Sequence, residues 1–282
     1  MRVINSVKEM QQWSQEQRRS GNRLGLVPTM GFLHQGHLSL VRLARADCDK
    51  VIVSIFVNPM QFGPNEDLED YPRDLKRDLT LLEAEGVDAV FNPEPAEMYP
   101  DGFSSAVTIE GEIAQKLCGS SRPGHFRGVT TVVCKLFNIC LPDKAYFGQK
   151  DAQQVMVLEK MVRELNFPLE IIRGPIVREE DGLAMSSRNT YLNEEQRQQA
   201  LVLSRSLNAA QAAIEGGERD PAKIKALLWE YIEASPLAEV DYIEIYDGEE
   251  LRDINTIECP ALIALAVRFG KTRLIDNLLV EG

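Results

Sequence analysis

The sequence predicts an α/β protein in which a doubly wound parallel sheet is followed by a smaller α+β domain. Short apolar strands alternate with amphipathic helices over residues 25–172. The run Val51–Val57 is rich in β-branched residues and nearly all apolar, which is typical of a strand buried on both faces of a parallel sheet. After Gly174 the pattern changes to a charged loop, long helices and further strands. We therefore expect one domain over residues 1–176 and a second over residues 177–282.

The elements of the first domain follow from capping and breaker residues. Ser6 opens a capping box, so a helix begins there and ends at Gly21. Residues 25–27 form the next strand, which Pro28 ends because proline has no N–H to donate to a ladder. Gly31 permits a sharp turn before the next helix, which begins near Gly36–His37. Further strands are expected at residues 51–57, 87–91, 145–147 and 169–172, and further helices over residues 75–82, 129–137 and 155–165. Such a Rossmann-like sheet binds ligands beyond the carboxyl ends of its strands.

The second domain begins with a charged loop, residues 178–189, that has neither helical nor strand periodicity. Asn193 caps a long helix that we expect to stop at Gly216, and Asp220 with Pro221 begins another helix. Strands are expected at residues 240–246, 262–267 and 274–280, as a small sheet covered by these helices.

Charge and composition exclude several classes of protein. The 282 residues carry a net charge of −12 and the pI is near 4.9, which argues against a nucleic-acid partner. No apolar run reaches the ~20 residues that span a bilayer, and the N-terminus lacks the apolar core of a signal peptide, so we expect a cytoplasmic protein without a membrane segment. The 5 cysteines are scattered among only 3 histidines, which argues against a zinc site and for reduced, mostly buried thiols.

Two histidines occupy the turn between the strand at residues 25–27 and the following helix. His34 and His37 would lie over the start of that helix, where unpaired backbone N–H groups and the positive end of the dipole attract phosphate. Gly36 between them would let a ligand approach closely. Two histidines at this spacing are often only surface or capping residues, but their place between a strand and a helix favours a phosphate site.

Two further loops follow predicted strands. Gln61 carries an amide that can bind the hydroxyl or carboxylate of a small substrate, although an Asn-Pro turn is more often only a turn. Lys150 lies at a helix entrance, where its ammonium and backbone donors could meet one phosphate, and a solvated lysine is the alternative. Asp151 is expected to cap that helix, and Gln154 to face the same way as Asp151.

The fourth segment is the loop that contains Met185, Ser186, Ser187 and Arg188. Two hydroxyls and a guanidinium in a loop without periodicity form a movable anion clamp, because the planar fork of arginine matches phosphate oxygens. A loop that closes on phosphates also excludes water from a site. An exposed loop arginine is common, so this segment gains weight only together with the other three.

Together the four segments resemble one superfamily. The string His34-Gln35-Gly36-His37 and the Met185–Arg188 loop are similar to the HIGH and KMSKS signatures of class I adenylate-forming nucleotidyltransferases. Within that superfamily, the strings PTMGFLHQGH, SIFVNPMQF, SRPGHFRGV, FGQKDAQQ and DGLAMSSRN resemble the pantoate–β-alanine ligase family. These strings occur in order and extend over nearly the whole chain.

The resemblance implies a two-step ligase that uses ATP and magnesium. The pantoate carboxylate would attack the α-phosphorus of ATP to give pantoyl adenylate and pyrophosphate, and the amine of β-alanine would then displace AMP. The product would be pantothenate, an intermediate of coenzyme A biosynthesis. No covalent enzyme intermediate is implied. The resemblance also suggests a homodimer.

The resemblance further assigns roles to residues of this sequence. His37 matches the position most often assigned as catalytic, and we interpret it as an electrostatic donor, because a carboxylate nucleophile has no proton for a base to remove. Gln61 and Gln154 would bind pantoate. The triphosphate would be held by His34, His37, Lys150, Ser186, Ser187 and Arg188, with His34, His37, Lys150 and Arg188 as the catalytic set. The adenosine would be lined by Met30, Gly31, Gly148, Asp151, Val177 and Met185.

Two assignments stay open at the level of sequence. Asp78 matches an acidic position that family members use near the metal, but the two residues before it are basic, which leaves a single carboxylate. Arg122, His125 and Arg127 lie in a glycine-rich loop, where they could meet pyrophosphate, β-alanine or another subunit, or could only stabilise the loop.

Three alternatives compete with this interpretation. Another adenylyltransferase of the superfamily would share the histidine turn and the sheet, but the neutral Gln61 and Gln154 segments favour a substrate without phosphate. A tRNA synthetase would need a basic tRNA-binding appendage that this acidic chain does not offer. A non-catalytic nucleotide-binding module would not require both the histidines and the Arg188 loop.

Overall fold

The computed structural model describes residues 1–64 and 66–281, so Asn65 and Gly282 lie outside the described residues. The chain divides into two compact units. The first comprises Met1–Glu110, Arg122–Gln149 and Val157–Pro175, and the second comprises Gly111–Ser121, Lys150–Met156 and Ile176–Gly282. Each unit thus takes segments from the middle of the chain, and a single boundary after residue 176 stays a prediction.

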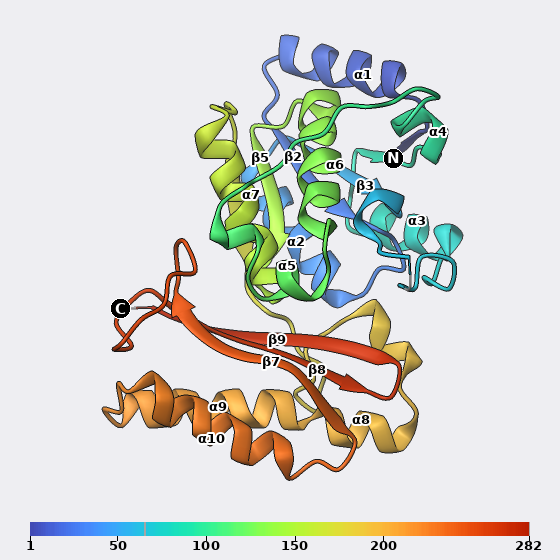
Figure 1. Cartoon of the computed structure of the whole chain (residues 1–282). Coiled ribbons are helices and arrows are strands. Elements are labelled where there is room, and N and C mark those ends of the chain that lie inside the picture. The colour runs from blue at the N-terminus through green and yellow to red at the C-terminus, as the bar shows by residue number, and fades with distance from the viewer. Residues whose placement is uncertain (65, 282) are drawn as a thin grey trace. The chain divides into compact units, whose positions relative to one another are not determined.

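The described part of the first unit is built on a six-stranded parallel sheet (Figure 1). Its strands are β1 (Arg2–Ile4), β2 (Leu24–Thr29), β3 (Lys50–Ile55), β4 (Ala89–Phe91), β5 (Lys144–Gly148) and β6 (Glu170–Gly174). They lie in the order β1-β4-β3-β2-β5-β6, and each neighbouring pair is parallel. The strand order reverses direction at β2, which borders both β3 and β5. The predicted doubly wound, Rossmann-like sheet is therefore confirmed.

Helices connect these strands and bury their apolar stripes on the sheet. α2 (Gln35–Asp47) contacts β2, β3, β5 and β6, while α1 (Val7–Arg19) and α6 (His125–Cys140) contact each other and β2. Val27, Val41 and Val53 have no exposed surface in the core beneath α2. Complete burial of one such side chain contributes about 1.5–3 kcal/mol. The remaining elements are η1 (Pro59–Gln61), α3 (Leu75–Ala84), α4 (Pro95–Met98), η3 (Gln149–Asp151) and α7 (Ala152–Glu164), of which η3 and α7 each have residues in both units.

Most predicted elements of this unit are confirmed, and two details are wrong. Ser6 caps α1 by accepting the N–H of Glu9, as expected from the capping box. The sequence does not predict β1, because a strand of three residues at the sheet edge, two of them exposed and one buried, gives no clear periodicity. Pro28 does not end β2, which continues to Thr29. The hydrogen-bonded pairing of β2 with β5 ends at Leu26, whereas pairing with β3 continues to Thr29. An N–H at position 28 would point toward β5, where no partner is paired, so proline is tolerated there.

The described part of the second unit contains a three-stranded antiparallel sheet (Figure 1). Its strands are β7 (Ala238–Asp247), β8 (Ala261–Phe269) and β9 (Thr272–Val280), and α9 (Val202–Glu215) and α10 (Pro221–Glu233) pack on it as predicted. The long helix expected after Asn193 is in fact α8 (Glu194–Ala200) and α9, interrupted at Leu201, which is buried in the apolar core of the unit. Shorter elements are η2 (Glu112–Ala114), α5 (Cys118–Ser121) and η4 (Ser187–Tyr191).

Two expectations from composition can be compared with the structure. Across residues 1–64 and 66–281, no helix is both long enough and apolar enough to cross a membrane. The cysteines are free thiols, and Cys48, Cys118 and Cys140 are buried, as expected.

Candidate active-site segments

The histidine turn, residues 30–37, follows the carboxyl end of β2 in the first unit. Because β2 borders both β3 and β5, this end lies at the switch point of the sheet, where open α/β sheets bind their ligands. Gly148 is the last residue of β5, the neighbouring strand. The structure thus brings the predicted histidine turn and Gly148 to one edge of the sheet.

The two histidines cap the start of α2 reciprocally. His34 is the N-cap residue, and its Nδ1 accepts the N–H of Gly36 at 3.2 Å. His37 Nδ1 accepts the backbone N–H of His34 at 3.3 Å, and the two ring centroids lie 4.0 Å apart. A neutral imidazole that accepts through Nδ1 carries its proton on Nε2. Each ring therefore acts as a donor through Nε2, so the capping and the phosphate-donor interpretations are compatible.

The backbone of the histidine turn is left-handed at two consecutive residues. Gly31 has a φ of 84° and Phe32 a φ of 51°. A Cβ on Gly31 would lie 3.0 Å from a methyl of Ile55 and 3.1 Å from the Asp78 carboxylate, so the turn requires glycine there. Asp78 is 1% exposed and accepts the N–H groups of Phe32 and Leu33 at 2.7 and 2.8 Å. Burial raises the pKa of Asp78, against the effect of these two donors.

The surroundings of Asp78 do not fit the predicted role near a metal. Its carboxylate is buried and each of its oxygens accepts a backbone N–H. Magnesium keeps several of its water ligands, which requires space around the carboxylate. The described residues contain no group of three or more His, Cys, Asp or Glu side chains that could hold a metal ion. The assignment of Asp78 as a metal ligand stays a prediction that these contacts do not support.

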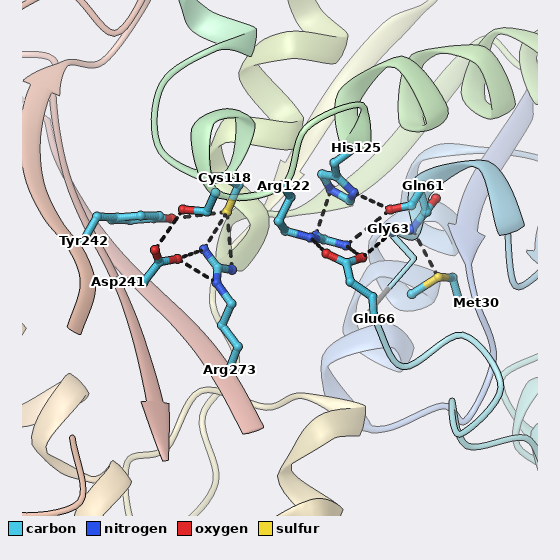
Figure 2. Close-up of polar contacts among 11 residues, drawn as sticks. Met30, Gln61, Gly63, Glu66, Cys118, Arg122, His125, Asp241, Tyr242 and Arg273 are labelled. Atoms are coloured by element: carbon cyan, nitrogen blue, oxygen red, sulfur yellow. Dashed lines mark hydrogen bonds and ion pairs between the residues drawn. The ribbon is translucent and has the colours of Figure 1, made fainter. Parts of the chain in front are cut away.

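Gln61 lies at the end of η1, next to the first residue of the histidine turn (Figure 2). Its Oε1 accepts a hydrogen bond from Asn58 at 3.1 Å, and its Nε2 donates to Met30 Sδ at 3.2 Å. Asn58 is 1% exposed and also donates to the Gly128 carbonyl at 3.2 Å, while its Oδ1 accepts the Tyr99 hydroxyl at 2.7 Å. The amide of Gln61 is therefore held in one orientation from both of its ends.

The sequence reasoning did not assign Asn58 and Gly128, although both left a signal. Asn58 precedes a proline and caps η1 by accepting the N–H of Met60, as asparagine does at turns. Gly128 interrupts the apolar pattern of α6. A Cβ there would lie 2.2 Å from the carbonyl oxygen of Met60, so only glycine lets η1 lie against the helix.

Arg122 and His125 contact the backbone at Gln61 (Figure 2). Arg122 forms two hydrogen bonds to the Glu66 carboxylate, at 2.6 and 2.7 Å, and donates to the Gln61 carbonyl at 3.3 Å. His125 Nδ1 lies 2.8 Å from the same carbonyl oxygen. Burial alone would raise the pKa of Glu66, but the Arg122 guanidinium lowers it to about 2. These contacts support the loop-stabilising interpretation of Arg122 and His125.

Lys150, Asp151 and Gln154 lie in the second unit. Lys150 Nζ is 3.4 Å from Asp151 Oδ1, and the Lys150 carbonyl accepts a hydrogen bond from Asn277 at 3.0 Å. Gln154 lies in the first turn of α7 and is half-buried. Asp151 pairs with the lysine, and its predicted capping of α7 stays a prediction.

The serine loop, residues 185–189, also belongs to the second unit. The N–H of Met185 donates to the Val177 carbonyl at 2.9 Å, which joins two residues assigned to the adenosine. Ser186 is the N-cap of η4, and its Oγ accepts the N–H of Arg188 at 3.3 Å. Ser187 is buried. The predicted Val177 and Met185–Arg188 positions are therefore neighbours in space.

Ion pairs hold the serine loop to the segment before it and to α8. Glu179 accepts hydrogen bonds from Asn189 and from Arg197, each at 2.6 Å. Arg197 also donates to Asp181 at 3.0 and 2.7 Å. Burial would raise the pKa of Asp181, but hydrogen bonds from the Leu183 N–H and from Arg197 hold it below the usual value. The loop thus keeps its shape through charged side chains near the surface.

Several known proteins match this chain over nearly its full length. Residues 2–279 match the family model described as pantoate-beta-alanine ligase. A pantothenate synthetase from Syntrophomonas wolfei is 61% identical over 281 residues, which cover 100% of both chains. A crystal structure of pantothenate synthetase from Thermus thermophilus has 45% identity and a TM-score of 0.94, with 100% of both chains covered. A pantoate-beta-alanine ligase from Francisella tularensis, complexed with beta-gamma ATP and beta-alanine, has 36% identity and a TM-score of 0.81, covering 99% of this chain and 97% of that one.

Proposed function

This chain belongs to the pantoate–β-alanine ligase family and is an ATP-dependent, pantothenate-forming ligase, and we propose that it activates pantoate as an adenylate with the residues described above. The observation that carries the proposal is the reciprocal cap of His34 and His37 at the switch point of the sheet. It fixes two Nε2 donors at the start of a helix whose N-terminus already favours phosphate.

In the first step, a carboxylate oxygen of pantoate attacks the α-phosphorus of ATP. The bond from that phosphorus to the bridging oxygen of pyrophosphate breaks, and pyrophosphate leaves. The ionised carboxylate has no proton to lose, so the step needs no general base. It needs donors placed where negative charge develops on the phosphate oxygens. In the first unit, His34 and His37 supply these donors.

The family resemblance also assigns cations and hydroxyls of the second unit to the phosphates. Arg188 offers a planar fork that matches two phosphate oxygens, and Lys150 offers a compact ammonium. Ser186 and Ser187 donate through their hydroxyl groups. The adenosine is assigned to Met30, Gly31, Gly148, Asp151, Val177 and Met185.

In the second step, the amine of β-alanine attacks the carbonyl carbon of pantoyl adenylate. AMP leaves with the oxygen that had joined carbon to phosphorus, and the nitrogen releases a proton. In both steps Gln61 and Gln154 orient the pantoate part of the substrate through its hydroxyl and carboxyl oxygens, and alignment of this kind lowers the barrier without any chemical participation. The amide of Gln61 is suited to this task because Asn58 and Met30 hold it in place.

Magnesium, a homodimer and a cytoplasmic location complete the proposal. When bound with ATP, magnesium would neutralise charge on the triphosphate. The described residues hold no cluster of three or more His, Cys, Asp or Glu side chains that could bind the ion. Equilibrium sedimentation of the purified protein tests the dimer, and a single species of monomer mass would contradict it.

An assay of AMP release tests the function. The purified protein is incubated with ATP and magnesium, with pantoate and β-alanine each present or omitted. Release of AMP that requires both acids is the expected result. No release, or release that is indifferent to β-alanine, would contradict the ligase.

A further inference from the structure

Asp78 occupies a position that the reaction itself does not explain. It lies in the first turn of α3, is 1% exposed, and binds two consecutive backbone N–H groups of the histidine turn. A buried carboxylate is costly unless hydrogen bonds replace its lost water, and bonds of 2.7 and 2.8 Å from Phe32 and Leu33 do so. Asp78 is therefore attached to the main chain of the turn from an element more than forty residues later in the sequence.

The backbone of the turn explains why an anion is needed there. Two consecutive left-handed residues, Gly31 and Phe32, direct the N–H groups that follow them toward one concave side of the chain. Such a concavity binds an anion, and here the Asp78 carboxylate occupies it. Phe32 has a steric penalty at positive φ that a glycine would not have, so the conformation requires support from outside the turn.

The turn connects directly to the histidine pair. Leu33 donates its N–H to Asp78, and the next residue, His34, is the N-cap of α2. The position of His34 in turn sets that of His37, because the backbone N–H of His34 donates to His37 Nδ1. A shift of the turn would therefore move both imidazoles away from their donor positions.

We propose that Asp78 is a positioning residue that holds the Gly31–Leu33 turn, and through it the two histidines, and that it is not a ligand of magnesium. The proposal depends on the proposed function only where it takes the histidines to serve adenylate formation. The role of Asp78 in holding the turn does not depend on it. It explains why the carboxylate is buried and why each of its oxygens accepts a main-chain N–H. A carboxylate that binds magnesium would instead need space beside it for the water ligands that the ion keeps, and Asp78 is only 1% exposed.

Asp78→Asn is the variant that separates the two roles. Asparagine keeps the size of the side chain but turns an NH2 group toward one of the two N–H donors. We expect amide hydrogen exchange at Phe32 or Leu33 to accelerate about 10-fold or more, and adenylate formation to slow about 30- to 100-fold. The magnesium concentration that gives half the maximal rate should change by less than about 2-fold. Unchanged exchange at both amides, or a rate restored by high magnesium, would overturn the proposal.

Asp74→Ala is the matched control at the N-cap of the same helix. Asp74 is exposed and caps α3 by accepting the N–H of Arg77 at 3.0 Å. The variant should therefore destabilise the start of α3 but leave the hydrogen bonds of the histidine turn in place. Exchange at Phe32 and Leu33 should stay at the wild-type rate, and adenylate formation within about 3-fold of it. An effect as large as that of Asp78→Asn would mean that any weakening of α3 suffices, and would overturn the specific role of Asp78.

The wild-type enzyme provides a measurement that does not depend on a folded variant. Exchange at Phe32 and Leu33 is compared in ATP with EDTA and in ATP with magnesium. Equal protection is expected, and faster exchange with magnesium would show that the ion competes for the carboxylate. If the wild-type protein released no AMP with both acids, the proposed function would fail, whereas these exchange rates would still decide the role of Asp78.

Discussion

The histidine turn and the serine loop are assigned the same task, donation to phosphate oxygens, but they are held in different ways. The histidine turn is shaped by two left-handed residues and by a carboxylate that is 1% exposed. The serine loop is held by Glu179, Asp181 and Arg197, whose side chains are 28%, 29% and 32% exposed. Buried contacts are little affected by solvent, whereas partly exposed ion pairs are weakened by salt and water.

This difference indicates how each region can respond to mutation. In the histidine turn, the donors themselves cap a helix, so a change of donor also changes local structure. In the serine loop, Ser186 also caps the short η4, but the ion pairs of Glu179 and Asp181 with Arg197 are formed by residues that are not assigned as donors. Substitution of a donor in the histidine turn should therefore reduce both the rate of adenylate formation and the stability of the fold. In the serine loop, a substitution can reduce the rate with little loss of stability.

Removal of one phosphate donor should have the largest effect. His37→Ala and Arg188→Ala should each slow adenylate formation about 100- to 1,000-fold. His37→Ala should also lower the free energy of unfolding by about 1 kcal/mol, because the His34 N–H loses its acceptor, while Arg188→Ala should change it by less than about 0.5 kcal/mol. Lys150→Ala should behave like Arg188→Ala. Urea unfolding measures the stability of each variant, and AMP release measures its rate. Equal losses of stability in His37→Ala and Arg188→Ala would contradict the difference between the two regions.

The ion pair of Arg122 and Glu66 extends the comparison to acid stability. The pKa of Glu66 is lowered to about 2 from 4.5 in an unfolded chain, so its contribution is complete above about pH 4.5 and is lost as the pH falls toward 2. Glu66→Gln should cost up to about 3 kcal/mol at neutral pH. The difference in free energy of unfolding between Glu66→Gln and the wild type should shrink steadily as the pH falls below 4.5. Unfolding followed by circular dichroism measures this difference. A difference that stays constant with pH would contradict the lowered pKa.

Loss of a supporting charge in the serine loop should have a smaller effect. Glu179→Gln removes the charged acceptor that joins Asn189 to Arg197, so KM for ATP should rise about 5- to 10-fold with little change in kcat. Glu244→Gln is the matched control, because Glu244 pairs with Lys225 at 2.8 Å in the same unit and has no assigned role. A rise of the same size in the control would indicate a general electrostatic effect.

The smallest expected effect is that of salt on the two regions. An increase from about 0.05 M to about 0.5 M salt should speed amide exchange at Met185 about 2- to 3-fold, because screening weakens the ion pairs around its loop. Exchange at Phe32 and Leu33 should not change, since their acceptor is buried. Equal sensitivity of the two sets of amides would show that the regions are held alike.

Local signals predicted most of the fold and the identity of the candidate residues. Caps at Ser6, Asn193 and Asp220 marked helix starts that the structure contains. The strings around His34 and Arg188 predicted the family because motif chemistry is local in sequence.

Contacts between distant segments could not be predicted in this way. Asp78 binds Leu33 across 45 residues, and Asn58 binds Gly128 across 70. Nothing in either local sequence specifies its partner, since the sheet and helix packing bring the segments together. The assignment of Asp78 near a metal came from an acidic residue in a matching position, and only its hydrogen bonds point to a role in positioning.

Transfer of an oxygen isotope tests the adenylate mechanism most directly. Pantoate labelled with ¹⁸O in both carboxylate oxygens is converted with ATP and β-alanine, and the ¹⁸O content of each product is measured by mass spectrometry. Attack of the carboxylate on the α-phosphorus places one labelled oxygen in AMP and leaves one in the amide of the product. This is the predicted result. Label in pyrophosphate or phosphate, or none in AMP, would contradict the attack at the α-phosphorus.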